Sequence, residues 1–179
     1  MLEEIIFAGF GGQGVLSLGQ TLTYAGMVDG REVCWMPSYG PEMRGGTANC
    51  AVSISSEPIS SPILAKFDAA IILNNPSFEK FESRVKPGGV LVYDSTNVTL
   101  TSKRTDIVIL AVPASAEANK LGNARMMGMI LLGAYLKQRP VLPISAVTKA
   151  LEKVLPERYH NLIPLNHRAL ETGASFAKN

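Results

Sequence analysis

The stretch FAGFGGQGVLSLGQ, residues 7–20, constrains the fold most, because its glycine cluster separates an apolar run from a helix-like run. Gly9, Gly11 and Gly14 follow the spacing G-x-G-x-x-G, which is typical of the strand-to-helix turn in dinucleotide-binding units. Glycines permit positive φ and close backbone approach, and the unpaired N–H groups at a helix start favour an anion. We therefore predict an anion-competent loop over residues 11–14.

The glycine spacing alone leaves other interpretations open. A nicotinamide dinucleotide site needs an acidic side chain ~20 residues further on, at the end of the second strand, to bind the ribose. Here Glu32 precedes that strand, and Met36 and Pro37 stand at its end, which disfavours this reading. The glycines could also serve only close packing of helix and strand. Gln13, beside Gly12, favours a bond to a ligand or to a neighbouring chain.

The hydrophobic pattern alternates between strand-like and helix-like segments. Strands are predicted at residues 4–8, 33–36, 48–54, 69–73, 90–93 and 106–112, and helices at residues 17–28, 77–85, 116–137, 144–155 and 162–177. Ser145 is the expected N-cap of the helix over 144–155. This order indicates one α/β domain over residues 1–179, with a mainly parallel sheet, a Rossmann-like glycine loop and C-terminal helices that cover the sheet.

Composition narrows the class of protein. The 179 residues are 46% hydrophobic and 18% charged, which suits one folded domain and argues against disorder. The net charge is +2 without a charge run, so no nucleic-acid partner is expected. The longest apolar stretch, residues 126–136, is too short to span a bilayer, and the acidic N-terminus does not resemble a signal peptide. We expect a cytoplasmic protein without membrane attachment.

Few residues suit catalysis or metal binding. The two cysteines, Cys34 and Cys50, are predicted to be buried free thiols, and they are too few to hold an iron–sulfur cluster within this chain. His160 and His167 are interpreted as surface or packing residues, and the methionines of residues 126–129 as core or interface residues. No Ser–His–Asp order and no metal-ligand spacing stands out, so we predict neither a catalytic nor a metal site in this chain.

A second loop, SYGPEMRGGTANC over residues 38–50, follows the second predicted strand. Loops at the carboxyl ends of parallel strands line the ligand crevice, so this loop should lie beside the glycine loop. Arg44 could bind a phosphate or carboxylate in bidentate fashion, and Tyr39 could stack on a flat ring. Ser38 and Gly45 complete the predicted pocket. The alternative is an exposed turn with an ion pair.

Five segments of the chain form a set that is specific in combination: GFGGQGVLSLGQTLTYAGM, SYGPEMRGGTANCAVSIS, VKPGGVLVYDS, LGNARMMGMILLGAYL and LPERYHNLIPLNHRALETGA. Together they resemble the gamma subunit of 2-oxoacid:ferredoxin oxidoreductases, over nearly the whole chain. The 2-oxoglutarate type is the most similar, and the 2-oxoisovalerate type follows. One position departs from the pattern, because Gly128 stands where many relatives have asparagine.

The resemblance implies a role within a complex. The family reaction converts a 2-oxoacid, coenzyme A and oxidised ferredoxin into acyl-CoA, carbon dioxide and reduced ferredoxin. Thiamine diphosphate, magnesium and iron–sulfur clusters would be held by the alpha, beta and ferredoxin-like delta subunits. This chain would pack on those subunits and share the coenzyme A site.

Within that site, the resemblance assigns backbone or anion contacts to Gly11, Gly12, Gln13 and Gly14 and the charged contact to Arg44, while Glu42 could instead reach a neighbouring subunit. Two alternatives remain: a purely structural subunit, and a stand-alone oxidoreductase that uses a dinucleotide. The isolated chain could also form a homodimer through its apolar faces.

Overall fold

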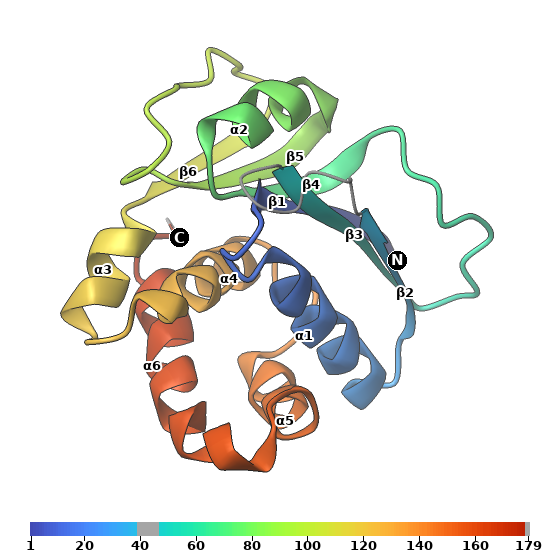
Figure 1. Ribbon diagram of the computed structural model, residues 1–179. Helices are drawn as coiled ribbons and strands as arrows, with labels where there is room; N and C mark the ends of the chain where they lie inside the picture. The colour runs from blue at the N-terminus through green and yellow to red at the C-terminus, as the bar shows by residue number, and fades with distance from the viewer. Residues whose placement is uncertain (39–46, 178–179) are drawn as a thin grey trace.

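The computed structural model describes residues 1–38 and 47–177, and a mixed, mainly parallel sheet lies at its centre (Figure 1). The six strands follow the order β2-β3-β1-β4-β5-β6. Only β3 runs against its neighbours β1 and β2, while the pairs β1/β4, β4/β5 and β5/β6 are parallel. The prediction of an α/β domain with a mainly parallel sheet is confirmed. The strands are β1 (Leu2–Phe10), β2 (Glu32–Ser38), β3 (Thr47–Ser55), β4 (Phe67–Ile72), β5 (Val85–Asp94) and β6 (Val108–Val112).

The helices form three groups around the sheet. They are α1 (Val15–Val28), α2 (Asn75–Phe81), α3 (Ala114–Lys120), α4 (Met127–Gln138), α5 (Ile144–Val154) and α6 (Ile163–Ala174), with 3₁₀ turns η1 (Glu82–Arg84), η2 (Ala124–Met126) and η3 (Glu157–Leu162). Figure 1 shows α2 on one face of the sheet and α1 and α4 on the other. The helices α5 and α6 pack on α1 and α4 and form an outer layer. The expectation that the C-terminal helices cover the sheet therefore holds for α4 only.

The predicted helix over residues 116–137 is wrong, because the chain breaks between α3 and α4. Gly122 adopts a left-handed conformation with a φ of 81°, which ends α3. Asn123 then caps η2, since its side chain accepts a hydrogen bond of 3.0 Å from the N–H of Arg125. The apolar periodicity continues across the break. It therefore did not reveal that a glycine ends one helix and that an asparagine caps the start of the next turn. The break gives α4 a separate beginning that lies close to α1.

Two smaller expectations also need correction. Helix α5 begins after Pro143, so Ser145 lies inside its first turn and is not the N-cap. Proline holds its φ at −71° and can precede a helix without a capping side chain. Both cysteines are free, but only Cys50 is fully buried; Cys34 lies on the edge strand β2 and is partly exposed.

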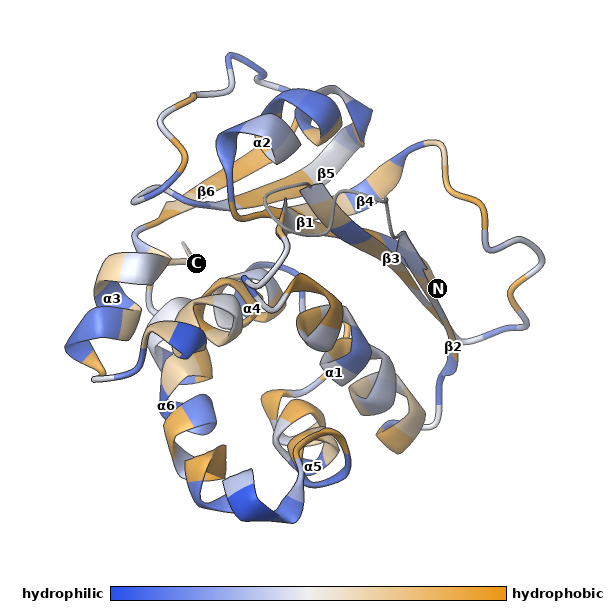
Figure 2. Cartoon of the chain, in the orientation of Figure 1, coloured by the Kyte–Doolittle hydropathy of each residue, from blue (hydrophilic) through white to orange (hydrophobic). Residues whose placement is uncertain are grey.

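Apolar side chains fill both faces of the sheet. The larger core lies between the sheet and the helices α1, α4, α5 and α6, and a smaller core lies under α2. Figure 2 shows that the strands and α4 are largely hydrophobic, whereas α5 and α6 carry both hydrophobic and hydrophilic residues, as an outer layer should. Within the described residues, no helix combines the length and apolar character that crossing a bilayer requires.

Candidate functional site

The glycine loop connects the end of β1 to the start of α1 and leaves the helix start open. Gly12 and Gly14 have φ values of 93° and 79°, a conformation that side chains other than glycine rarely adopt. Gly14 is the N-cap residue, and no side chain of the described residues caps the first turn. The N–H groups of that turn are therefore available to an anion, which the helix dipole also favours.

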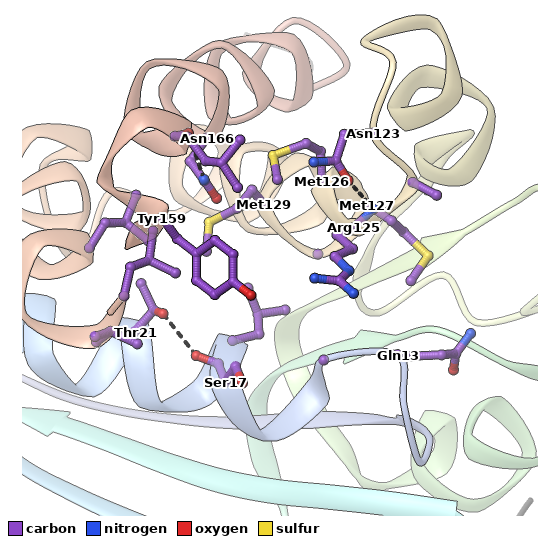
Figure 3. A pocket seen from close by; sticks show the side chains of 18 of the residues that line it. Gln13, Ser17, Thr21, Asn123, Arg125, Met126, Met127, Met129, Tyr159 and Asn166 are labelled. Atoms are coloured by element: carbon purple, nitrogen blue, oxygen red, sulfur yellow. Dashed lines mark hydrogen bonds between the residues drawn. The ribbon is translucent and has the colours of Figure 1, made fainter. Parts of the chain in front are cut away.

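Gln13 fastens this loop to the sheet. Its Oε1 accepts a hydrogen bond of 2.6 Å from the N–H of Phe10, and its Nε2 donates to the carbonyl of Leu73 at 3.5 Å. The amide thus bridges the end of β1 and the residue that follows β4. Figure 3 shows the Gln13 side chain pointing away from the other labelled residues. In the described structure its polar atoms serve the loop itself.

A cavity of about 960 Å³ opens above the start of α1 (Figure 3). Its walls come from the glycine loop, α1, the η2–α4 segment, the end of α5, η3 and the start of α6. Of the predicted glycine-loop residues, Gly12, Gln13 and Gly14 line it, whereas Gly9 and Gly11 do not. The volume lies near the upper end of the range for small-molecule sites, which is about 300–1,000 Å³.

Arg125 gives the cavity its charge. Of the described residues that line the cavity, it is the only charged one. It is exposed on η2, directly after the asparagine cap, and Figure 3 shows its guanidinium directed into the cavity towards α1. Among the described residues it forms no ion pair with a carboxylate. A guanidinium and an uncapped helix start therefore border one cavity, which makes it electropositive.

Asp94, a fully buried carboxylate at the end of β5, holds two of the residues that line the cavity. Ser115 Oγ donates to its Oδ2 at 2.6 Å, and Asn97 Nδ2 donates to the same atom at 2.7 Å. Asp94 also accepts from the N–H of Ser115 at 3.1 Å, so it caps the start of α3. Ser115 and Asn97 both line the cavity and are fixed by this carboxylate.

The predicted second loop lies largely outside the described residues. Tyr39, Arg44 and Gly45 fall there, as does Glu42. The residues that flank it are described: Ser38 ends β2, and Thr47 begins β3 in register with Phe10, at the end of β1. Both ends of the loop thus join the sheet at the edge that carries the glycine loop, although Ser38 is not among the residues that line the cavity.

Comparison with known proteins decides the family. The model of the family described as pyruvate ferredoxin/flavodoxin oxidoreductase matches residues 4–176. The chain belongs to this family. A crystal structure of the gamma subunit of keto/oxoacid ferredoxin oxidoreductase from Geobacter sulfurreducens has the same fold, with a TM-score of 0.84, 29% identity, and coverage of 98% of this chain and 96% of that chain. The predicted resemblance to the gamma subunit is confirmed.

Two curated relatives are also similar to the chain. The ketoisovalerate oxidoreductase subunit VorA of Methanothermobacter thermautotrophicus is 38% identical over 98% of this chain, and the 2-oxoglutarate synthase subunit KorC of Methanocaldococcus jannaschii is 30% identical over 88%. The chain spans 36% of the length of VorA but 86% of the length of KorC. The sequence motifs ranked the 2-oxoglutarate type first, and the identities of these two relatives run in the opposite order.

Among the described residues, the side chains that could hold a metal ion are scattered. Within residues 1–38 and 47–177, no three His, Cys, Asp or Glu side chains gather as metal ligands would. The chain has two cysteines, and a cluster normally takes four. His160 and His167 make packing contacts, because His160 Nε2 donates to the carbonyl of Leu155 at 2.9 Å and His167 Nδ1 lies 3.1 Å from Thr148 Oγ1.

Sequence reasoning missed three of the side chains that line the cavity. Arg125, Tyr159 and Asn166 all line it, and none was singled out from the sequence. Arg125 and Tyr159 lie in 3₁₀ turns, where periodicity carries little information, and Asn166 lies in the first half of α6. The one available signal was the segment LGNARMMG, in which Gly122 and Asn123 mark a helix break that carries a cation.

Proposed function

We propose that the chain is the gamma-type component of a 2-oxoacid:ferredoxin oxidoreductase and that its cavity binds coenzyme A. The complex would oxidatively decarboxylate a 2-oxoacid, transfer the acyl group to coenzyme A and pass electrons to ferredoxin. Thiamine diphosphate, magnesium and iron–sulfur clusters belong in this proposal to the alpha, beta and ferredoxin-like delta subunits. The chain itself binds and orients coenzyme A and breaks no bond.

One observation carries the proposal: the uncapped start of α1 and the Arg125 guanidinium border the same cavity. Coenzyme A has a diphosphate and a 3′-phosphate, which need cations and N–H donors. Gly12 and Gly14 leave room for a phosphate to approach the backbone, because neither would place a Cβ near another atom. No described residue that lines the cavity is acidic, so nothing there repels the anion.

The second loop belongs to the same proposal. Tyr39, Arg44 and Gly45 would extend the phosphate site from the neighbouring strand ends, with Ser38 at the start of the loop. The register of Thr47 opposite Phe10 supports this arrangement, because the loop has to leave and rejoin the sheet beside the glycine loop. Arg44 and Arg125 would then contact the phosphates from two directions.

The 2-oxoacid is a separate question. Two of the relatives that resemble the chain carry names for ketoisovalerate and for 2-oxoglutarate. We propose that the 2-oxoacid, 2-oxoglutarate or a branched-chain analogue, is selected on the partner subunits. This chain then handles the coenzyme A that is common to all these reactions.

The assembled complex provides the test. Arg125→Ala should raise the KM for coenzyme A about tenfold or more, since a charge-assisted contact contributes about 1.5–3 kcal/mol. Decarboxylation of the 2-oxoacid measured without coenzyme A should be unchanged. Arg44→Ala should likewise raise the KM for coenzyme A and leave decarboxylation without coenzyme A unchanged.

Lys120→Ala is the matched control, because Lys120 is an exposed cation on α3 that does not line the cavity. The control should leave the KM for coenzyme A unchanged. An unchanged KM in both arginine variants would leave the chain with an assembly role only.

A further inference from the structure

The ladder between β1 and β4 ends in an irregular step at the carboxyl edge of the sheet. The N–H of Leu73 donates to the carbonyl of Ala8 at 2.9 Å. In a regular parallel ladder the next bond would run from the N–H of Phe10 to the carbonyl of Leu73. Instead, the Phe10 N–H donates to Oε1 of Gln13 at 2.6 Å, and Nε2 of Gln13 donates to the Leu73 carbonyl at 3.5 Å. One side-chain amide therefore takes the place of a bond between the two strands.

This amide lies where the sheet changes the face on which its helices pack. Figure 1 shows α1, which follows β1, on one face of the sheet and α2, which follows β4, on the other. Neighbouring parallel strands whose helices diverge in this way leave a crevice at their carboxyl ends, which is the usual ligand site of an open α/β sheet. An inserted amide is longer than a direct hydrogen bond, so Gln13 spans the two strands where they begin to separate.

Gly9 provides the space that the amide needs. A Cβ at Gly9 would lie 2.7 Å from Oε1 of Gln13 and 2.9 Å from Cβ of Leu73, so a larger residue would displace the amide. This contact explains why the first position of the G-x-G-x-x-G spacing is glycine here, although Gly9 neither has a positive φ nor lines the cavity. Gly9, Gln13 and Leu73 thus form one packed unit.

The same amide closes the turn that leads into α1. The main-chain N–H of Gln13 donates to the carbonyl of Phe10 at 3.2 Å, and the side-chain bond to the Phe10 N–H closes the turn a second time. The glycines of this loop have more conformational freedom than other residues, and an anion can bind only after that freedom is lost. The bonds of Gln13 remove part of it before the ligand arrives. Figure 3 shows its side chain pointing away from the other labelled residues of the cavity.

We propose that Gln13 is a positioning residue for the anion site: its amide joins β1 to β4 and holds the glycine loop in the conformation that presents the start of α1 to the ligand. The inference rests on the proposed function. The role needs an acceptor for Phe10 and a donor for Leu73 on a side chain that reaches both, and a neutral amide of this length provides them. Gln13 therefore acts on the ligand indirectly, through the backbone of the loop.

Two substitutions test this role in the assembled complex. Gln13→Met keeps the approximate length of the side chain without its donor and acceptor, and Gln13→Asn keeps the amide but is one methylene too short to reach both strands. Each should raise the KM for coenzyme A about threefold to tenfold, as the loss of one or two hydrogen bonds would. Decarboxylation measured without coenzyme A should be unchanged, which also shows that the complex has assembled.

Hydrogen exchange without coenzyme A distinguishes positioning from direct contact. In the wild type the Phe10 N–H is protected by its bond to Gln13, so peptides that contain residues 10–16 should exchange faster in both variants. A residue that only touched the ligand would leave this exchange unchanged. Asn75→Leu is the matched control, because it removes an amide at the neighbouring strand end that bonds Thr99 and does not line the cavity. The control should change neither the KM nor the exchange of residues 10–16.

The outcomes separate this role from the proposed function. Unchanged exchange in both variants, or faster exchange with an unchanged KM, would overturn the positioning role. Wild-type values in Gln13→Asn alone would overturn the bridge between the strands. In each of these cases a raised KM in Arg125→Ala would still support coenzyme A binding by this chain. Unchanged KM values in the arginine variants, with a raised KM in both Gln13 variants, would instead overturn the proposed charge contacts and support the positioning role.

Discussion

Cys34 and Cys50 lie on neighbouring strands but differ in their surroundings. Cys50 is fully buried under α1, and burial raises the pKa of its thiol to about 12. Cys34 lies on the edge strand β2 and is partly exposed. With excess iodoacetamide at pH 8 we expect one equivalent to react per native chain, at Cys34, and two after unfolding in guanidinium. Peptide mapping would locate the label, and rapid native labelling of Cys50 would contradict the described packing.

The Cys50 thiol also gives a pH dependence of stability. In the unfolded chain it ionises near its ordinary pKa of 9.0, whereas in the folded chain it keeps its proton to about pH 12. Its contribution to stability is therefore fully present below pH 9 and is lost as the pH rises from 9 towards 12, by at most about 1.4 kcal/mol per pH unit. The difference in unfolding free energy between wild type and Cys50→Ala should shrink over this interval. A constant difference would contradict the assignment.

At the scale of residues, the sequence predicted a glycine loop between β1 and α1, where the backbone conformation determines the structure. Of the three glycines in the G-x-G-x-x-G spacing, Gly14 has a positive φ, whereas Gly9 and Gly11 do not; the other positive φ of the loop lies at Gly12. The sequence did not identify Asn166 or Tyr159, because their places in the cavity wall depend on which surface α6 and η3 turn towards α1. That choice is made by tertiary packing and leaves no local pattern.

At the scale of elements, the crossing of α4 and α6 depends on two glycines. A Cβ at Gly133 would overlap the carbonyl of Leu170, and one at Gly173 would overlap the carbonyl of Ile130. Backbone atoms on the opposite helix cannot rotate away as a side chain can. We expect Gly133→Ala to reduce the unfolding free energy by about 2 kcal/mol or more, as overpacking does, despite the higher helix propensity of alanine.

Gly128→Ala in the same helix is the matched control. A Cβ there would lie 3.3 Å from Cδ2 of Leu18, the end of a flexible side chain. The control should change stability by less than about 1 kcal/mol, and denaturant unfolding of both variants would measure the difference. Equal effects would mean that the α4–α6 contact is looser than described.

The strands were predictable from the sequence, and the helical layers were not. Each predicted strand is present, because apolar runs of strand length bounded by turn residues leave few alternatives. The break at Gly122 and the outer position of α5 and α6 were missed. A helix that packs on other helices has the same amphipathic pattern as one that packs on a sheet, so periodicity cannot distinguish the layers.

At the scale of the whole molecule, the two edges of the sheet have different roles. The carboxyl edge opens into the cavity, while the amino edge is closed by ion pairs. Glu3 on β1 is 2% exposed and joins α4, because Tyr135 Oη donates to its Oε1 at 2.9 Å and Arg139 Nε lies 2.7 Å from the same oxygen. Nearby, Lys86 on β5 lies 2.6 Å from a Glu4 oxygen and 3.1 Å from an Asp68 oxygen. The Glu3 contacts fix the end of α4 to the sheet, and the Lys86 contacts join β5 to β1 and β4. Both sets lie at the edge opposite the cavity.

This division predicts that stability and ligand binding can be changed separately. Burial raises the pKa of Glu3, although Arg139 and Tyr135 oppose the shift. The contribution of Glu3 to stability is therefore fully present below its unfolded pKa, near 4.5, and is lost as the pH rises through the folded pKa. Relative to Glu3→Gln, the wild type should lose unfolding free energy as the pH rises above 4.5. The KM for coenzyme A in the assembled complex should be the same in both proteins. A raised KM in Glu3→Gln would mean that the amino edge also positions the cavity, and that the two edges are coupled through α4.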